Sequence, residues 1–308
     1  MKKESKENNN NNNLFPWQRP KSKKEDPNAP KQVKKIMESP SYQVLEDNIS
    51  FLDSDEARGI RLQLDYLRAE VKMQEHGIDN TIVVFGSTRI IETDSAIEKL
   101  KKVERELEES PHSEKLLTAL GVAERMVKKS IYYDEARQFG KLVGESGKGP
   151  EDCRVTLMTG GGPGIMEAAN RGAFDVGAKS IGLNIELPHE QFPNPYITPD
   201  LCFQFYYFSI RKLHFLHRAK ALVIFPGGLG TFDELFEILT LIQTQKNDPI
   251  PVVLVGKQYW KRAVNFEFLS EEGVIGTSDL DVLIHVDSAK DAWEKIIQWY
   301  QKRKIPLF

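Results

Sequence analysis

Seven short apolar runs recur along the chain, and each is followed by a glycine turn or polar loop or by a segment with helical spacing. The runs lie at residues 81–85, 155–158, 179–185, 201–205, 221–225, 251–255 and 281–286. Continuous apolar runs of this length are typical of strands buried on both faces of a sheet. Strands that alternate with helices predict an α/β fold, a doubly wound, mostly parallel, Rossmann-like sheet.

The intervening segments carry apolar residues at helical spacing. Helices are expected at residues 131–145, 165–175, 207–219, 259–269 and 289–302, and after Thr231. Residues 94–110 are rich in both Lys/Arg and Glu, which predicts a solvated helix laced with ion pairs, inserted after the first strand.

Two further helices are predicted before the first strand, at residues 41–52 and 54–75. Ile60, Leu64, Leu67 and Val71 form the apolar stripe of the second. We expect these helices to pack on the sheet or on a partner subunit. Residues 1–35, with six consecutive asparagines and four prolines among lysines, are expected to be disordered. The predicted organisation is a tail at 1–35, N-terminal helices at 36–80 and a Rossmann-like domain at 81–308.

Composition and charge narrow the class of protein. The chain of 308 residues has a net charge of −3, but residues 1–35 contain ten Lys/Arg and four Asp/Glu, a net of +6 that leaves −9 for the rest. A basic tail can contact nucleic acid or an anionic membrane; mixed signs and few aromatic residues favour a solvated tail instead.

Without an apolar stretch of about 18 residues or a secretory signal, we expect no membrane span and a cytoplasmic protein. Cys153 and Cys202 lack zinc spacing, which favours reduced thiols.

Residues 221–243 combine a strand, a glycine turn and a helix. After the apolar run comes Pro226, followed by Gly227, Gly228, Leu229 and Gly230, and then Thr231 opens helical spacing. Free N–H groups at such a helix start, with the positive end of its dipole, bind anions such as phosphate. In the alternative interpretation, Thr231 and Glu234 form a capping box and the turn is only structural. The turn is not a Walker A loop, because no Gly-Lys-Ser/Thr follows.

Four loops at the carboxyl ends of strands predict a ligand crevice along one edge of the sheet. They lie at residues 86–88, 159–164, 184–186 and 226–231. Arg211 and Glu234 each lie near the start of a helix that leaves this edge, so we expect both to face the crevice. A carboxylate that stabilises an oxocarbenium-like centre and a cation for developing negative charge would suit cleavage of a ribosyl bond. The alternative for Arg211 is a surface or interface ion pair, with Glu234 as one candidate partner.

These motifs resemble those of the LOG ("lonely guy") family. The resemblance is carried by Pro226 to Glu234 (PGGLGTFDE), by Arg211-Lys212 and by residues 160–170 (GGGPGIMEAAN), and it covers residues 81–286. Members were long labelled lysine decarboxylases and include cytokinin-activating phosphoribohydrolases and bacterial nucleotide 5′-monophosphate nucleosidases. The loop at 182–191 and the N-terminal helices resemble the larger bacterial members, which points away from a cytokinin substrate.

The resemblance implies hydrolysis of a nucleoside 5′-monophosphate, AMP or similar, to free base and ribose 5-phosphate without a metal or cofactor. It assigns catalysis to Arg211 and Glu234. The expected substrate- and phosphate-binding residues are Gly86, Ser87, Gly161, Gly162, Met166, Gly228, Gly230 and Thr231. It also implies a homodimer or higher homo-oligomer with the site near the subunit interface, and residues 234–245 are apolar enough to lie there.

Two other functions compete with the nucleosidase. The same crevice could hold a nucleotide or a pterin-type cofactor in a non-catalytic sensor or carrier. A lysine decarboxylase needs a Schiff-base lysine, and the chain has no His-Lys dipeptide of the sort familiar in those enzymes.

Overall fold

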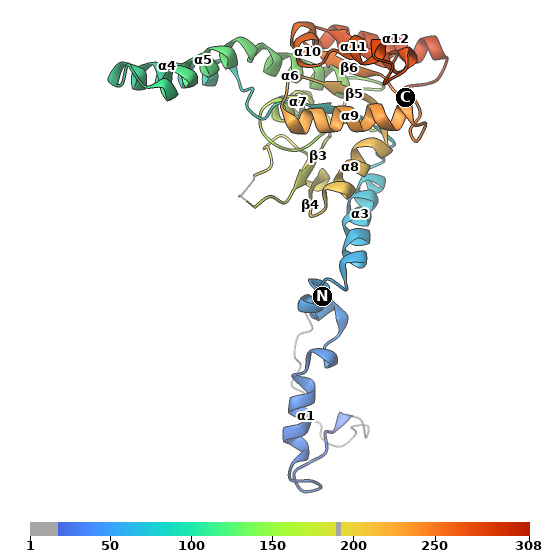
Figure 1. The fold of residues 1–308 in the computed structure, drawn as a ribbon. Coiled ribbons are helices and arrows are strands. Elements are labelled where there is room, and N and C mark those ends of the chain that lie inside the picture. The colour runs from blue at the N-terminus through green and yellow to red at the C-terminus, as the bar shows by residue number, and fades with distance from the viewer. Residues whose placement is uncertain (1–17, 189–191) are drawn as a thin grey trace. The chain divides into compact units, whose positions relative to one another are not determined.

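The computed structural model describes residues 18–188 and 192–308, and the chain divides into two compact units, residues 1–61 and 62–308. The larger unit is built on one seven-stranded sheet (Figure 1). Its strands are β1 (Asn80–Phe85), β2 (Val155–Thr159), β3 (Ser180–Ile185), β4 (Cys202–Phe205), β5 (Ala219–Ile224), β6 (Val252–Val255) and β7 (Leu283–Val286). All neighbouring strands are parallel. The predicted doubly wound α/β fold is confirmed.

The strand order is β4-β3-β2-β1-β5-β6-β7, so the sheet winds outward in opposite directions from the β1–β5 pair. Phe85 at the end of β1 lies beside Ile224 at the end of β5. Because successive connections leave in opposite directions here, the loops after the two strands diverge and open a crevice.

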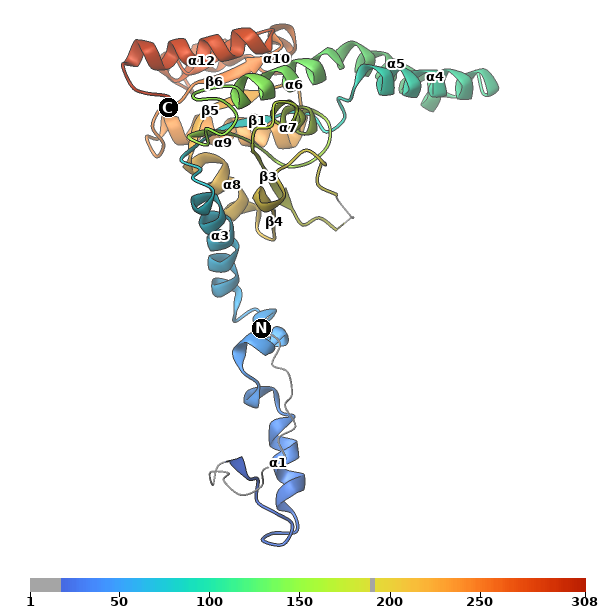
Figure 2. The same ribbon diagram turned by 180° about the vertical axis from the view of Figure 1, so that it is seen from behind.

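Successive side chains of β1 enter two separate cores, as expected for a strand covered on both faces. Ile82 and Val84 pack with residues of α6 (Ile131–Gly144), α7 (Ile165–Asp175) and α12 (Ala289–Arg303). On the opposite face, Val83 and Phe85 belong to a second core cluster with residues of α8 (Phe208–His217), α9 (Leu229–Gln243), α10 (Lys257–Ala263) and α11 (Phe266–Glu271). In both views α12 and α9 lie on opposite sides of β5 and β6 (Figures 1 and 2).

The single helix predicted at 259–269 is wrong, because the chain forms α10 and α11 there. Val264 between them is extended, and the Asn265 side chain caps α11 by accepting the N–H of Phe268. No helix in the described part of the chain is long and apolar enough to cross a bilayer.

The charged insertion is helical, as predicted, but it is one half of a hairpin. Helix α4 (Thr93–Glu109) is followed by α5 (Glu114–Lys129), which was not predicted, and the two lie side by side in both views (Figures 1 and 2). The Ser113 side chain accepts the N–H of Leu116 and starts α5.

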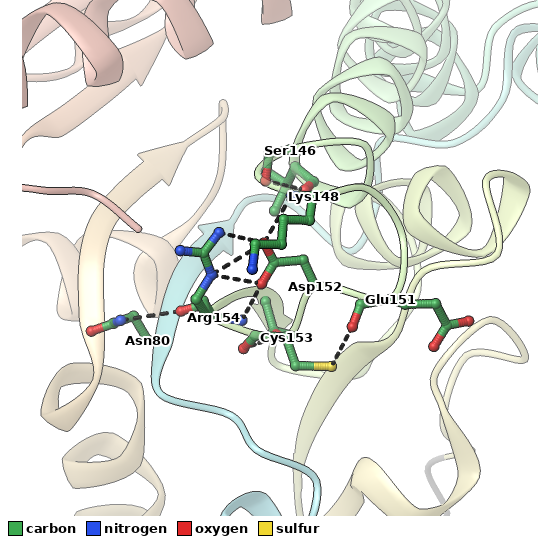
Figure 3. Close-up of polar contacts among 9 residues, drawn as sticks. Asn80, Ser146, Lys148, Glu151, Asp152, Cys153 and Arg154 are labelled. Atoms are coloured by element: carbon green, nitrogen blue, oxygen red, sulfur yellow. Dashed lines mark hydrogen bonds and ion pairs between the residues drawn. The ribbon is translucent and has the colours of Figure 1, made fainter.

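The carboxylate of Asp152 stabilises the turn that leads into β2 (Figure 3). Asp152 accepts the N–H of Lys148 at 2.8 Å and pairs with Arg154 at 2.7 Å, and Arg154 keeps the pKa of Asp152 well below its usual range. The Asn80 side chain donates to the carbonyl of Arg154 and so joins the starts of β1 and β2. Cys153 in this turn and Cys202 are both free, as predicted.

The apolar stripe predicted for α3 (Arg58–Glu75) is wrong. Leu64, Leu67 and Val71 are exposed, whereas Ala69 and Met73 on the opposite face are buried in the second core cluster. Polar contacts set this rotation of the helix. Its Asp65 carboxylate accepts the N–H groups of residues 206 and 207, and its Glu70 pairs with Arg218 at 2.5 Å.

The smaller unit contains α1 (Ala29–Met37), α2 (Ile49–Leu52) and 3₁₀ turns at Pro40–Tyr42 and Leu45–Asp47. The one helix expected at 41–52 is therefore broken into short turns. Asn48 accounts for part of this break, because its side chain caps α2 and donates to the carbonyl of Pro40. Residues 1–17 of the predicted disordered tail lie outside the described residues, and α1 begins within its remainder. Packing of residues 36–61 on the core stays a prediction.

Candidate active site

A cavity of about 540 Å³ opens at the carboxyl ends of β1 and β5, where the strand order reverses. Eight of the ten residues predicted for the site line it: Gly86, Ser87, Met166, Arg211, Gly228, Gly230, Thr231 and Glu234. The other lining residues are Phe85, Thr88, Arg89, Phe208, Leu229 and Asp233. The fold thus brings together segments that are far apart in sequence.

Backbone hydrogen bonds tie the cavity loops to one another. Ser87 donates its N–H to the carbonyl of Pro226 at 3.0 Å, and the Ser87 carbonyl accepts the N–H of Ile165 at 3.1 Å. A Cβ on Gly86 would lie 2.6 Å from the Ile165 side chain, so only glycine permits this approach. The loops after β1, β2 and β5 therefore form a preorganised wall.

The turn after β5 leads into α9 with its first amides open to the cavity. Gly228 is the N-cap, and its carbonyl accepts the N–H groups of Thr231 and Phe232. A Cβ added to Gly228 or Gly230 would meet nothing within 4 Å, because both face open space. A Cβ on Gly227, in contrast, would lie 2.1 Å from the Thr231 hydroxyl. The amides and the helix dipole make this end of the cavity favourable for an anion.

The capping-box interpretation is wrong, because Thr231 lies inside α9 and no side chain in the described part of the chain caps the helix start. Glu234 is 7% exposed, and among the described residues no group lies within hydrogen-bonding or ion-pair distance of its carboxylate. A buried carboxyl group without a structural partner lies ready for a ligand.

Arg211 is held in place by backbone carbonyls at the ends of two other strands. Its Nε donates to Leu183 at 2.7 Å, its Nη2 donates to Gly160 at 3.5 Å, and its guanidinium lies 5.1 Å from the ring centroid of Phe215. A Cβ on Gly160 would approach Nη2 to 2.6 Å. Arg211 does not form an ion pair with Glu234, so Glu234 is wrong as the candidate partner in the structural alternative, while an ion pair of Arg211 across a subunit interface stays a prediction.

Burial raises the pKa of Glu234 to about 7, and the nearby positive charges of Lys212 and Arg211 oppose this rise. Glu237 and Asp233 add to the rise. A carboxyl group that titrates near neutral pH inside a cavity is typical of catalytic sites, because both of its protonation states are then accessible.

Gly161 and Gly162 are buried and do not line the cavity. Their carbonyls accept the backbone N–H and the side-chain amide of Asn194, respectively, and the same amide donates to Asn170 at 3.0 Å. A Cβ on Gly161 would lie 1.7 Å from Asn184 Oδ1, so this glycine serves loop packing.

Sequence reasoning missed Arg89 and Phe208 as lining residues. Arg89 is exposed, and among the described residues its guanidinium has no hydrogen-bonding or ion-pair partner. Its position directly after the loop at 86–88 was the available signal. Within residues 18–188 and 192–308, no group of three or more histidine, cysteine or acidic side chains is placed to hold a metal ion.

Comparison with known proteins adds independent information. Residues 166–296 match the family model described as possible lysine decarboxylase. The chain is 27% identical over 181 residues to the Arabidopsis thaliana cytokinin riboside 5′-monophosphate phosphoribohydrolase LOG4, covering 56% of this chain and 77% of that protein. It is 29% identical over 139 residues to the pyrimidine/purine nucleotide 5′-monophosphate nucleosidase of Escherichia coli (strain K12), covering 40% of this chain and 28% of that protein.

Among solved structures, the X-ray structure of TM1055 matches with a TM-score of 0.42 and 18% identity, covering 71% of this chain and 99% of that one. The family model and the curated relatives, taken with the motifs in the cavity, confirm the resemblance of this chain to the LOG family.

Proposed function

We propose that this protein hydrolyses the N-glycosidic bond of nucleoside 5′-monophosphates, AMP or similar, to release free base and ribose 5-phosphate. The observation that carries the proposal is the presence of Arg211 and an unpaired Glu234 in the cavity that also receives the open start of α9. Relatives named as phosphoribohydrolases and nucleosidases support a glycosidase-type activity.

In this proposal the 5′-phosphate occupies the start of α9. Backbone amides and the helix dipole favour a dianion there, and Arg89, which lines the same cavity, adds a positive charge. The phosphate would then fix the ribose relative to Glu234, five residues beyond the first residue of the helix.

Glu234 in its ionised form would stabilise the oxocarbenium-like ribose and orient the attacking water. Arg211 would stabilise the negative charge that develops on the departing base. Because its guanidinium is already fixed by two carbonyls, little reorganisation is needed as the charge forms. Met166 and Phe208 are apolar lining residues suited to contact the base.

We also propose that the protein is a homo-oligomer that associates through α9. Phe236 is 39% exposed, and Leu239, Leu241 and Ile242 on the same helix are only half-buried. An apolar helix surface next to the cavity suits a subunit interface.

The test is to incubate the purified protein with the common purine and pyrimidine monophosphates and to quantify free base and ribose 5-phosphate. We expect turnover of at least one monophosphate. Glu234→Gln and Arg211→Ala should each lower kcat by about 100-fold or more. Glu294→Gln, on the exposed surface of α12, is the matched control and should retain activity.

Failure to release base from every monophosphate, or full activity in Glu234→Gln, would contradict the proposal. Tight nucleotide binding in isothermal titration without turnover would indicate the sensor or carrier function instead.

A further inference from the structure

Three carboxyl groups lie within about one turn of α9, and one ammonium group from α8 contacts two of them. Lys212 Nζ is 2.7 Å from Asp233 Oδ2 and 3.1 Å from Glu237 Oε2. The Lys212 side chain is 19% exposed and that of Glu237 is 30% exposed, so water screens this pair only partly, whereas Asp233 is 57% exposed. The third carboxyl group, Glu234, lies between the two paired residues in sequence and has no such partner.

We propose that Lys212 is a positioning residue for Glu234: it neutralises Asp233 and Glu237, so that Glu234 can carry its charge while its carboxylate stays free for substrate. This inference rests on the proposed function, in which ionised Glu234 contacts the ribose. It assigns a role to a side chain that does not itself line the cavity.

Electrostatics explains why the site needs this ammonium. Without Lys212, a buried Glu234 would have to ionise between two other negative charges on its own helix, and like charges at this spacing disfavour ionisation. A direct partner for Glu234 would favour ionisation equally well, but it would occupy the oxygens that must face the ligand. Pairing the flanking carboxylates with Lys212 lowers the free energy needed to ionise Glu234 and leaves the oxygens of Glu234 open.

The charged groups around Glu234 fall on three elements. Arg211 and Lys212 come from α8, and Asp233 and Glu237 come from α9. Arg89, in the loop after β1, lines the same cavity. Lys212 has the largest effect of the charged groups that favour the ionised form of Glu234. Removal of Lys212 should therefore raise the pKa of Glu234.

The experiment measures kcat/KM for base release against pH in four proteins: the wild type, Lys212→Met, Lys212→Arg and the double variant Asp233→Asn/Glu237→Gln. In Lys212→Met the acidic limb should move to higher pH by about one unit, a roughly tenfold loss of rate at a pH below the limb. In the double variant Lys212 loses its partners, so the limb should move to lower pH. Lys212→Arg keeps the charge and should stay close to the wild type.

If Lys212 only tied α8 to α9, both variants should lose activity and the acidic limb of the pH profile should stay at the same pH. An unchanged acidic limb in both variants would therefore overturn the proposal. The amide variants preserve side-chain shape, so the double variant tests the idea even if Lys212→Met does not fold.

A second readout separates this inference from the proposed function. The pKa of the Glu234 carboxyl can be followed by NMR in protein labelled with ¹³C at glutamate, with Glu234→Gln to assign the signal. If the pKa moves in the expected directions but no monophosphate is hydrolysed, the role of Lys212 stands and the proposed reaction fails. If the pKa does not respond to Lys212→Met, the role of Lys212 is wrong whatever the activity.

Discussion

At the scale of single residues, the burial of Glu234 suits the proposed reaction but lowers the stability of the fold. Glu234 is almost fully buried, yet it has no hydrogen-bonding partner in the described part of the chain. Burial of a carboxyl group in this way disfavours its charged form and raises its pKa to about 7. A neutral residue of the same shape would make the folded state more stable, so we infer that Glu234 serves ligand binding and not stability.

Glu234→Gln should therefore stabilise the protein in a pH-dependent way. The pKa of about 7 in the folded chain exceeds the ordinary value of 4.5, so the folded state binds this proton more tightly and loses stability as pH rises from about 4.5 through 7. The substitution removes that loss. We expect a gain in free energy of unfolding of up to about 3 kcal/mol at pH 8 and almost none at pH 4.

Urea denaturation of both proteins at the two pH values measures this gain. An equal difference at pH 4 and pH 8 would show that ionisation of Glu234 is not what opposes folding.

At the scale of elements, the close crossing of α6 and α7 holds one wall of the cavity. A Cβ on Gly140 of α6 would lie 2.0 Å from the carbonyl oxygen of Ala169, and a Cβ on Gly172 of α7 would lie 1.9 Å from that of Arg137. Both contacts are with backbone, which cannot move aside. The two glycines let the helices meet backbone to backbone, and α7 then presents Met166 to the cavity.

Gly140→Ala should destabilise the protein by about 1–3 kcal/mol, because the added methyl group forces these helices apart. Gly121→Ala is the matched control in α5, where the added Cβ meets only the flexible end of Arg125 at 3.4 Å. There alanine should stabilise by up to about 1 kcal/mol through its helix propensity. Thermal denaturation compares the two, and similar midpoints for both variants would contradict the crossing argument.

At the scale of the whole molecule, the proposed assembly depends on the apolar surface of α9. This helix supplies Thr231 and Glu234 to the cavity and Leu235 and Ile238 to the second core cluster, while Phe236 remains exposed. One helix thus contributes to the core, to the site and to an apolar surface. Association through that surface would couple the geometry of the site to the oligomer.

Phe236→Glu should lower the solution mass toward that of the monomer, because a charge in an apolar interface must be desolvated on association. Light scattering coupled to size-exclusion chromatography measures the mass. Phe268→Glu, which changes an exposed aromatic residue on α11, should leave it unchanged. A monomeric wild type would overturn the assembly proposal.

Structure was predicted correctly where the local pattern of apolar residues determines it, and wrongly where contacts with distant residues determine it. The apolar runs at 81–85 and 221–225 are short, continuous and followed by glycine or polar loops, which favours buried strands, and their parallel order followed from the helices between them. The stripe of α3 was misassigned because the helix is apolar on two faces, and contacts of Asp65 and Glu70 with distant residues select which one is buried. Gly161 does not line the cavity, and its motif could not show this, because its neighbours Asn184 and Asn194 come from distant segments of the chain.

The order of the strands along the chain, the parallel sheet and the edge that bears the glycine turns were predicted from the sequence alone, because burial pattern and backbone freedom are local properties. Tertiary structure decided which side chains reach the cavity, that Arg211 binds backbone carbonyls and not Glu234, and that Lys212 pairs with Asp233 and Glu237. The reason is physical. Ionisation and pairing depend on distances of a few ångströms between segments far apart in the chain, and only folding sets those distances.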